Sequence, residues 1–209
     1  MFLNRLDAGN KLRNKLEKYK KDSPIILSIP RGGLIVAYST IINFNSDWDF
    51  LMPRKIGAPS NKEIAIGAVS SDGTYFIDNN YVKKLNISKE YIQREVLLQL
   101  KEIRKRIEKY RPNKKFPNLE NKTVIIIDDG IATGFTIKAA IKSLKKQKAK
   151  KIIIAVPVAP KISIDKLKKE VDEVICLYVP NKFYSVGNYY HEFKQVTDKE
   201  IKETILKLS

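Results

Sequence analysis

Residues 124–136 read VIIIDDGIATGFT, where four aliphatic residues lead into two carboxylates and then into a loop of small and hydroxyl residues. A short, continuous apolar run bounded by turn residues is typical of a strand that is buried on both faces of a sheet. The residues from Thr133 onward have the pattern of a helix. Asp128 and Asp129 are therefore expected at the carboxyl end of a buried strand, where open α/β sheets bind their ligands.

The acid pair and the loop together have the chemistry of a sugar-phosphate site. At a strand end the chain is already turning, so both carboxylates can reach the crevice, where they can accept hydrogen bonds from hydroxyls or bind Mg²⁺, directly or through water. Backbone N–H groups of the loop and the N-terminus of the next helix can hold a phosphate. The loop residues expected at this phosphate are Gly130, Ala132, Thr133, Gly134, Phe135 and Thr136. These groups predict a ribose 5-phosphate.

The alternative for this stretch is an ordinary strand–turn–helix in which the acids cap the helix. The acid pair alone favours that alternative, whereas the whole stretch favours phosphate binding. Two other phosphate loops do not compete, because the sequence contains neither G-x-x-x-x-G-K-[ST] nor G-x-G-x-x-G.

Strand-like and helix-like segments alternate along the chain, which predicts an open, mostly parallel twisted sheet flanked by helices. Within 64–78 we expect two short strands joined around Asp72-Gly73. The segment 88–112 has one apolar stripe at helical spacing, with Ser88 as its cap and Pro112 at its end. The other expected strands are 23–30, 48–54, 122–129, 150–158 and 172–180, and the other expected helices are 32–43, 133–147, 163–171 and a short one from residue 198.

Composition narrows the class of protein. The chain has 209 residues, of which 43% are hydrophobic, and one cysteine, which suits a reducing cytoplasm. We expect no membrane association, because no stretch approaches about 18 consecutive apolar residues and the start has no signal-peptide core. The formal net charge of +17 favours polyanionic ligands such as phosphorylated metabolites or nucleic acid. The plainer explanation is that lysine-rich faces keep the protein in solution.

Two further segments have features of anion sites. Pro30, Arg31, Gly32 and Gly33 follow a predicted strand and open a helix, and the glycines allow positive φ and close backbone approach to pyrophosphate oxygens. The alternative there is a tight strand–helix turn. Arg54 and Lys55 are expected to end the next strand on the same side of the sheet, before an exposed loop at 57–63. A solvated basic turn is the alternative for this second segment.

Four of these segments carry a resemblance to a known family. VIIIDDGIATGFT resembles the motif of type I phosphoribosyltransferases that binds 5-phosphoribosyl 1-pyrophosphate (PRPP). SIPRGGLIVA (28–37) resembles the pyrophosphate loop of that fold. RKIGAPSNKEIAIGAV (54–69) and FYSVGNYYHEFKQVTDKEI (183–201) resemble a predicted phosphoribosyltransferase branch of bacteria and archaea. The likeness covers most of the chain and implies one phosphoribosyltransferase-like domain over 1–209.

The resemblance also implies roles for residues. Asp128 and Asp129 would hold the ribose hydroxyls and Mg²⁺. The loop at 30–33 would bind pyrophosphate and contain a non-proline cis peptide. Arg54 and Lys55 would meet the leaving pyrophosphate. The loop at 57–63 would close as a lid. Residues 181–209, with part of 1–22, would form a hood over the acceptor, where Phe183 and Tyr184 are the candidates for stacking; packing of a small subdomain is the alternative for these aromatic side chains. A cytoplasmic homodimer is expected.

The expected reaction is transfer of the phosphoribosyl group of PRPP to a nitrogen nucleophile, usually a nucleobase, with release of pyrophosphate. The base is not assigned. Enzymes that act on 6-oxopurines carry a third acid where this chain has Ala132. The "ATG" of 132–134 resembles adenine and uracil enzymes, but the other segments do not resemble those enzymes. The alternative is a non-catalytic regulator that senses PRPP or nucleotides and binds nucleic acid through its basic surface. Weak, non-specific nucleic-acid binding is expected of an enzyme with this charge.

Overall fold

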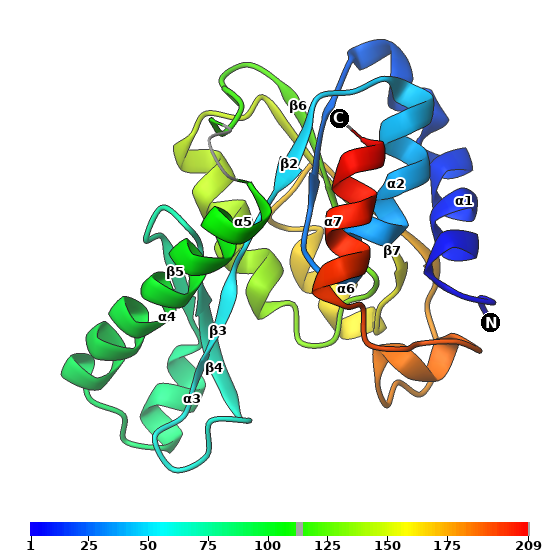
Figure 1. The fold of residues 1–209 in the computed structure, drawn as a ribbon. Coiled ribbons are helices and arrows are strands. Elements are labelled where there is room, and N and C mark those ends of the chain that lie inside the picture. The colour runs from blue at the N-terminus through cyan, green and yellow to red at the C-terminus, as the bar shows by residue number, and fades with distance from the viewer. Residues whose placement is uncertain (112–114, 209) are drawn as a thin grey trace. The chain divides into compact units, whose positions relative to one another are not determined.

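The computed structural model describes residues 1–111 and 115–208, which form two compact units (Figure 1). Unit 1 comprises Met1–Phe50, Lys115–Thr133 and Lys148–Ser209, and unit 2 comprises Leu51–Lys114 and Gly134–Gln147. The chain passes from unit 1 to unit 2 within the quoted stretch, after Thr133.

Unit 1 is built on a five-stranded sheet in the order β2-β1-β6-β7-β8, in which all four strand pairs are parallel. The strands are β1 (Ile25–Ser28), β2 (Trp48–Phe50), β6 (Thr123–Ile127), β7 (Lys151–Val158) and β8 (Glu173–Tyr178). The central strands β1, β6 and β7 are almost entirely buried because helices cover a parallel sheet on both faces. In the β1–β6 register, Ile25 pairs with Val124 and Ser28 with Ile127, so the carboxyl ends of the two strands lie side by side.

The helical segments of unit 1 are α1 (Arg5–Leu16), η1 (Glu17–Asp22), α2 (Gly32–Phe44), α6 (Lys161–Leu167), η2 (Val186–Tyr189) and α7 (Asp198–Lys207). Helix α1 packs closely on α2, because Gly9 faces the backbone of Val36, where an added Cβ would lie 2.4 Å from the carbonyl oxygen. Helix α7 begins with a capping box formed by Thr197 and Glu200, and it also contacts α2.

Unit 2 is a three-stranded antiparallel sheet in the order β3-β4-β5 with three helices. The elements are β3 (Arg54–Gly57), β4 (Ala65–Val69), β5 (Tyr75–Ile77), α3 (Asn79–Lys84), α4 (Lys89–Tyr110) and α5 (Phe135–Lys146). Gly73 in the β4–β5 turn has φ +83°, as a tight hairpin requires. Ser88 caps α4 by accepting a hydrogen bond from the Tyr91 N–H.

The α/β fold class is confirmed, with three differences in detail. The strand expected at 48–54 is two strands, since β2 belongs to the parallel sheet and β3 to the antiparallel one. Helices α1 and α3 were not predicted. Helix α4 ends at Tyr110, and Pro112, the expected end marker, lies outside the described residues. Within residues 1–111 and 115–208, no helix combines the length and the apolar character needed to span a bilayer.

Candidate active site

The acid pair lies directly after β6, as predicted. The Asp129 N–H donates to Asp128 Oδ1 at 2.8 Å, which turns the chain out of the strand. The following loop is fixed to the neighbouring part of unit 1: the Ile131 N–H donates to the Val158 carbonyl at 2.9 Å, and the Ser163 hydroxyl donates to the Ala132 carbonyl at 2.6 Å. Ala132 itself is exposed at the surface of unit 1.

The surroundings of Asp128 raise the pKa of its carboxyl group. Asp128 is intermediate in exposure, but its carboxyl group is surrounded by protein atoms, and this burial raises the pKa well above that of an ordinary aspartate. The negative charge of Asp129 raises the pKa of Asp128 further, whereas the Asp129 N–H and the Arg5 guanidinium lower it. Two adjacent carboxylates in such a place create a strong demand for a hydroxyl donor or a cation.

The loop of residues 30–33 lies against the acid pair. Ile29 N–H donates to the Ile127 carbonyl at 3.0 Å, which joins the end of β1 to the end of β6. The Pro30–Arg31 peptide is cis, as the resemblance implies. A Cβ on Gly32 would lie 1.9 Å from Asp129 Oδ2, and one on Gly33 would lie 2.8 Å from the Ile127 carbonyl oxygen. Both positions therefore require glycine because of close approach.

Our reason for these glycines needs one correction. We expected them to supply positive φ, but among the described residues the only glycines with positive φ are Gly73 and Gly134. Arg31, the charged residue of the loop, lies 3.8 Å from Asp198 and is one-third exposed, so its guanidinium is held by α7 at its first residue.

Side chains from both ends of unit 1 cover the loop after β6. Arg5 Nε donates to Asp129 Oδ2 at 2.8 Å, and the Tyr190 hydroxyl donates to the Asp129 carbonyl at 2.6 Å. Burial raises the pKa of the Tyr190 phenol, so it remains a donor. Val186 closes on Gly130, where an added Cβ would lie 2.5 Å from the Val186 side chain.

These covering side chains belong to one apolar cluster, which we call the terminal cap and define as residues 1–8 and 183–194. Phe2 N–H donates to the Tyr189 carbonyl, and His191 N–H donates back to the Phe2 carbonyl, so the two segments pair along their backbones. Phe2, Ala8, Val158 and Tyr190 form the buried centre, and Phe183, Val186, Tyr189 and Phe193 pack against it. The predicted hood residues thus include both segments.

The two side chains predicted to stack on an acceptor lie in different surroundings. Phe183 is stacked on Tyr189, with ring centroids 5.7 Å apart and an interplanar angle of 18°. Tyr184 is 78% exposed and extends from the cap. Phe183 therefore has a packing role within the cap, and Tyr184 is the aromatic side chain of the pair that is available to a ligand.

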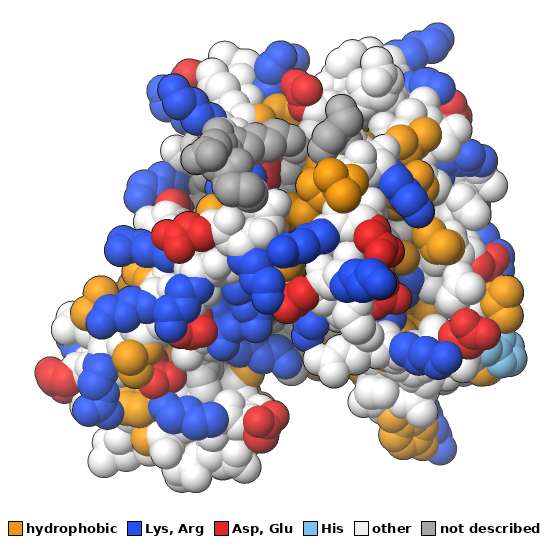
Figure 2. Space-filling view, viewed as in Figure 1, with side chains coloured by type: hydrophobic (Ala, Val, Ile, Leu, Met, Phe, Trp, Pro, Cys, Tyr) orange, Lys and Arg blue, Asp and Glu red, His pale blue; other side chains and the backbone are white. Residues whose placement is uncertain are grey.

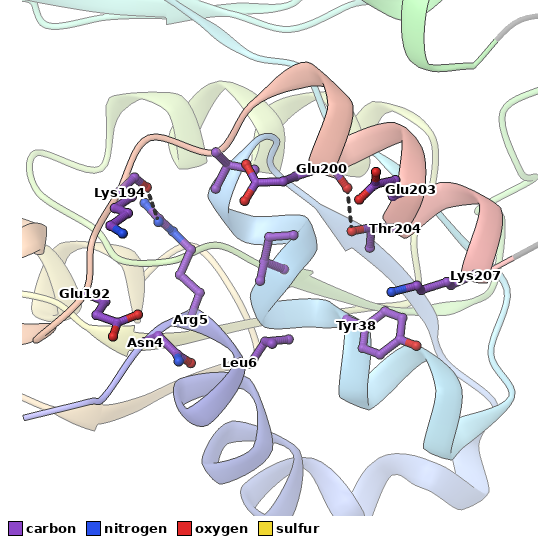
Figure 3. Close-up of a pocket in the computed structure, with 12 residues that line it drawn as sticks. Asn4, Arg5, Leu6, Tyr38, Glu192, Lys194, Glu200, Glu203, Thr204 and Lys207 are labelled. Carbon is purple, nitrogen blue, oxygen red and sulfur yellow. Dashed lines mark hydrogen bonds between the residues drawn. The ribbon is translucent and has the colours of Figure 1, made fainter.

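A cavity of about 390 Å³ lies in unit 1 between α1, α2 and α7 (Figure 3). Its wall includes Arg5, Tyr38, Lys194, Glu200 and Lys207, but neither acid of the pair. In Figure 3 the Arg5 side chain extends from α1 toward the backbone of Lys194. Arg5 thus belongs both to this cavity and to the surroundings of Asp129.

The second half of the predicted phosphate loop belongs to unit 2. Gly134 caps α5 with φ +76°, and the first N–H groups of this helix follow it. The Phe135 ring is buried with Ala68 and Ala139 and lies 5.5 Å from the Phe76 ring, so this residue offers a ligand only its backbone. The Thr136 side chain is half-buried in the first turn of α5.

Arg54 and Lys55 do not end a strand of the parallel sheet, as we expected; they open β3 of unit 2. Arg54 Nε donates to Gln99 on α4 at 2.7 Å. Lys55 is exposed and, as the next residue of the strand, points to the opposite face. The expectation was wrong because Pro53 cannot donate to a ladder of hydrogen bonds and so interrupts the strand predicted at 48–54.

The loop at 57–63 connects β3 to β4 and is fastened to α4. The Ala58 N–H donates to the Ile64 carbonyl at 2.8 Å. Lys62 Nζ lies 2.8 Å from Glu95 Oε1 and donates to the Tyr91 hydroxyl at 2.6 Å. Glu95 is only 5% exposed, so Lys62 neutralises a carboxylate that is otherwise covered by protein.

Sequence reasoning missed Arg5, Phe193 and Gln99. Arg5 and Asp129 are 124 residues apart, and the short segment around Arg5 resembles any amphipathic helix start. Gln99 lies on the predicted helix 88–112, but nothing in the sequence indicates that it faces Arg54. One signal in the sequence did point to this region, namely the crowding of aromatic residues at 183–193. We considered aromatic residues there for stacking on an acceptor, and the same segment contains Phe193, whose ring lies beneath Arg5.

The acid pair fits Mg²⁺ as a shared rather than a complete metal site. Carboxylate oxygens are suitable ligands for this hard cation. A bound cation would also offset the cost of burying the Asp128 carboxylate. Among the residues that the structure describes, no group of three or more His, Cys, Asp or Glu is placed to hold a metal. Mg²⁺ would therefore be held by Asp128 and Asp129 together with oxygens of the substrate.

The raised pKa of Asp128 predicts that Asp128→Asn stabilises the folded protein. A carboxyl group with a raised folded-state pKa loses stabilising free energy as the pH rises from its unfolded-state value through the folded-state value, and an amide does not titrate. The Asn oxygen can still accept the Asp129 N–H. We expect the Tm of Asp128→Asn to exceed the wild-type Tm at pH 8, with the difference shrinking as the pH falls toward 4.

The control for this prediction is Asp165→Asn, which changes an exposed carboxylate paired with Lys161. Its Tm should change little over the same pH range. A Tm for Asp128→Asn that is equal to or below that of the wild type at pH 8 would show that the buried carboxylate carries no cost.

Comparison with known proteins agrees with this geometry. The model of the phosphoribosyl transferase domain family matches residues 4–193. The crystal structure of TT1426 from Thermus thermophilus is similar with a TM-score of 0.84 and 33% sequence identity, covering 100% of this chain and 99% of that chain. A purine phosphoribosyltransferase from Pyrococcus horikoshii shares the fold, with a TM-score of 0.51, 20% identity and coverage of 94% and 97%.

Two curated relatives from strains of Mycobacterium tuberculosis, provisionally named phosphoribosyl transferases, are each 33% identical over 201 residues. That alignment covers 96% of this chain but 45% of each relative, so the chain spans about half the length of these relatives. The family match, which takes in the acid pair, the loop of residues 30–33 and most of the terminal cap, establishes that the chain belongs to the phosphoribosyl transferase domain family.

Proposed function

We propose that the chain transfers the 5-phosphoribosyl group of PRPP to a nitrogen nucleophile, with a nucleobase as the acceptor, and releases pyrophosphate. The observation that carries this proposal is the meeting of two loops in unit 1: the acid pair after β6 and the glycine loop after β1, where Gly32 fits against Asp129. One loop offers carboxylates to a diol, and the other offers backbone N–H groups to phosphate oxygens.

The residues would act mainly by positioning and by charge. Asp128 and Asp129 would accept hydrogen bonds from the 2- and 3-hydroxyls, and their negative charge would stabilise the positive charge that develops on the ribose as the bond to pyrophosphate breaks. Residues 30–33 would bind the pyrophosphate, and residues 130–136 would bind the 5-phosphate. Mg²⁺, when bound, would supply charge neutralisation between pyrophosphate and ribose oxygens.

The basic residues of unit 2 would serve the leaving group. Because neighbouring strand residues point to opposite faces, the pyrophosphate would meet either Arg54, which is oriented by Gln99, or the exposed Lys55, and Lys62 extends from the same hairpin. Closure of the loop at 57–63 would exclude water from the reacting carbon. In the terminal cap, the proposed hood, Tyr184 is the aromatic side chain available to stack on a base.

A second candidate function rests on the distribution of charge. Unit 2 contains 18 Lys and Arg against 7 Asp and Glu, a net charge of +11 out of the +17 of the whole chain. Figure 2 shows Lys and Arg side chains gathered over α4, interspersed with acidic ones. A regulator that binds PRPP and nucleic acid would use such a surface. We rank it below the enzyme because the two loops of unit 1 account for specific anion binding without these side chains.

The acid pair tests the proposed reaction. Asp128→Asn and Asp129→Asn should each lower the turnover of PRPP about 10-fold or more, because a hydrogen bond to a charged group is worth roughly 1.5–3 kcal/mol. Turnover is measured as pyrophosphate release from PRPP and Mg²⁺ with a panel of bases, which also identifies the acceptor. Unchanged kinetics in the double variant would contradict the assignment, and release that no base accelerates would favour the regulator.

The loop at 57–63 should behave as a lid. We expect hydrogen exchange of its backbone amides to slow when PRPP and Mg²⁺ bind, and Glu95→Gln to speed exchange in the free protein by removing the charge that holds Lys62. Glu108→Gln, an exposed change on the same helix, is the control. Equal protection of 57–63 with and without ligand would exclude a lid.

Salt separates the two functions. For an enzyme, we expect mixed-sequence RNA and duplex DNA to bind no more tightly than about 10⁻⁶ M at physiological salt, and binding to fall with a log–log slope near −0.9 per phosphate contacted on duplex DNA. PRPP binding should persist at that salt because its proposed donors are backbone N–H groups, which are screened less than exposed side-chain charges. Filter binding at two salt concentrations measures both. Nanomolar, sequence-selective nucleic-acid binding would support the regulator instead.

A further inference from the structure

The Arg5 side chain makes three contacts in three directions. Its Nε donates to Asp129 Oδ2 at 2.8 Å, and its Nη1 donates to the Lys194 carbonyl at 2.8 Å. Its Cζ lies 3.8 Å from the centroid of the Phe193 ring, a cation–π distance. The Arg5 side chain is 11% exposed and that of Asp129 is 18% exposed. These three contacts together fix the orientation of the planar guanidinium.

Asp129 is consequently fixed at two points from the terminal cap. Arg5 holds its carboxylate, and the Tyr190 hydroxyl holds its backbone carbonyl. Gly32 closes the third side, because a Cβ there would lie 1.9 Å from Oδ2 and 2.7 Å from Arg5 Nε. The carboxylate cannot swing toward the loop of residues 30–33, and one of its oxygens is committed to Arg5.

Arginine suits this position better than lysine. The Nε and Nη1 donors diverge from one rigid plane, so one side chain reaches the carboxylate and the Lys194 carbonyl while its face rests on an aromatic ring. An ammonium group would have to give up at least the stacking contact. The geometry is that of an orienting group and differs from a loose surface ion pair, in which both side chains are exposed.

We propose that Arg5 is a positioning residue for the phosphoribosyl transfer: it fixes the Asp129 carboxylate in the orientation that the ribose hydroxyls require, and it makes that orientation depend on the terminal cap being in place. The inference rests on the proposed function for its ligand. Arg5 acts through Asp129, so its removal matters only while Asp129 is present. Displacement of the 183–194 segment of the cap, which carries Phe193 and Lys194, would remove two of the contacts that hold Arg5 and would release the acid.

The first test needs no ligand. The ¹⁵N–¹H signal of the Arg5 side-chain Nε should be protected from exchange with water in the wild type and should lose that protection in Asp129→Asn. Arg13, on the same helix, donates from its guanidinium to the neighbouring Asn14 side chain; it is the matched control and should not change. A rapidly exchanging Arg5 signal in the wild type would overturn the proposal.

The second test is a double-mutant cycle on PRPP affinity, measured by calorimetry with Mg²⁺. Arg5→Gln should weaken binding about 10-fold or more in the wild-type background, in the range found when orienting partners are removed, and less than about 2-fold in the Asp129→Asn background. Arg13→Gln should leave the affinity unchanged in both. Phe193→Leu, which keeps both charges but removes the ring, should give an intermediate loss and serves if Arg5→Gln does not fold.

The outcomes separate the two proposals. Affinity for PRPP that is unchanged or increased in Arg5→Gln would overturn the positioning role and leave the proposed function standing. Equal losses in the two backgrounds would likewise show that Arg5 acts independently of Asp129. A wild-type protein that binds no PRPP would overturn the proposed function, and the positioning role with it, even if the Nε signal reported the contact.

Discussion

Two parallel strands that end side by side impose the constraint on which the rest of unit 1 depends. The register of β1 and β6 places Ser28 opposite Ile127, so whatever follows each strand must share one small volume. One loop fills it with two carboxylates, and the other can enter only without side chains, which is why Gly32 and Gly33 are glycines. The helix α2, the cis peptide and the covering cap are all arranged around this meeting point.

The same meeting point concentrates negative charge where water is scarce. Folded proteins tolerate such a group when hydrogen bonds and an opposite charge surround it. Here the donors to the carboxylates are the Asp129 N–H, which reaches Asp128, and the Arg5 guanidinium, which reaches Asp129. Even so, burial and the neighbouring charge of Asp129 raise the pKa of Asp128. A site that remains unfavourable for its own charge is well suited to a ligand that brings hydroxyls or a cation.

The sequence was sufficient for β1, β6, β7 and β8 and for the acid pair at a strand end, because a continuous apolar run followed by small residues is a local signal. It also predicted the β4–β5 hairpin from Asp72-Gly73. It was insufficient where the deciding contact is distant: Arg5 reaches Asp129 across 124 residues, and Gln99 orients Arg54 from another element. Phe135 shows a further limit: the sequence predicts it for the phosphate loop, and nothing local indicates that its ring packs in the core of unit 2.

The pairing of the terminal cap has a consequence for the order of folding. Phe2 and Arg5 find their backbone partners at Tyr189 and Lys194, the latter 189 residues along the chain. During synthesis the strands of the parallel sheet are made while residues 1–8 still lack these partners, so the cap can close only after residues 183–194 have been made. Contacts of such long sequence separation form slowly. Until they form, the apolar side chains of residues 1–8 are exposed and can associate with the wrong partners. Asp7 and Lys11, which pair with each other in the folded protein, place charge close to Phe2 in that segment.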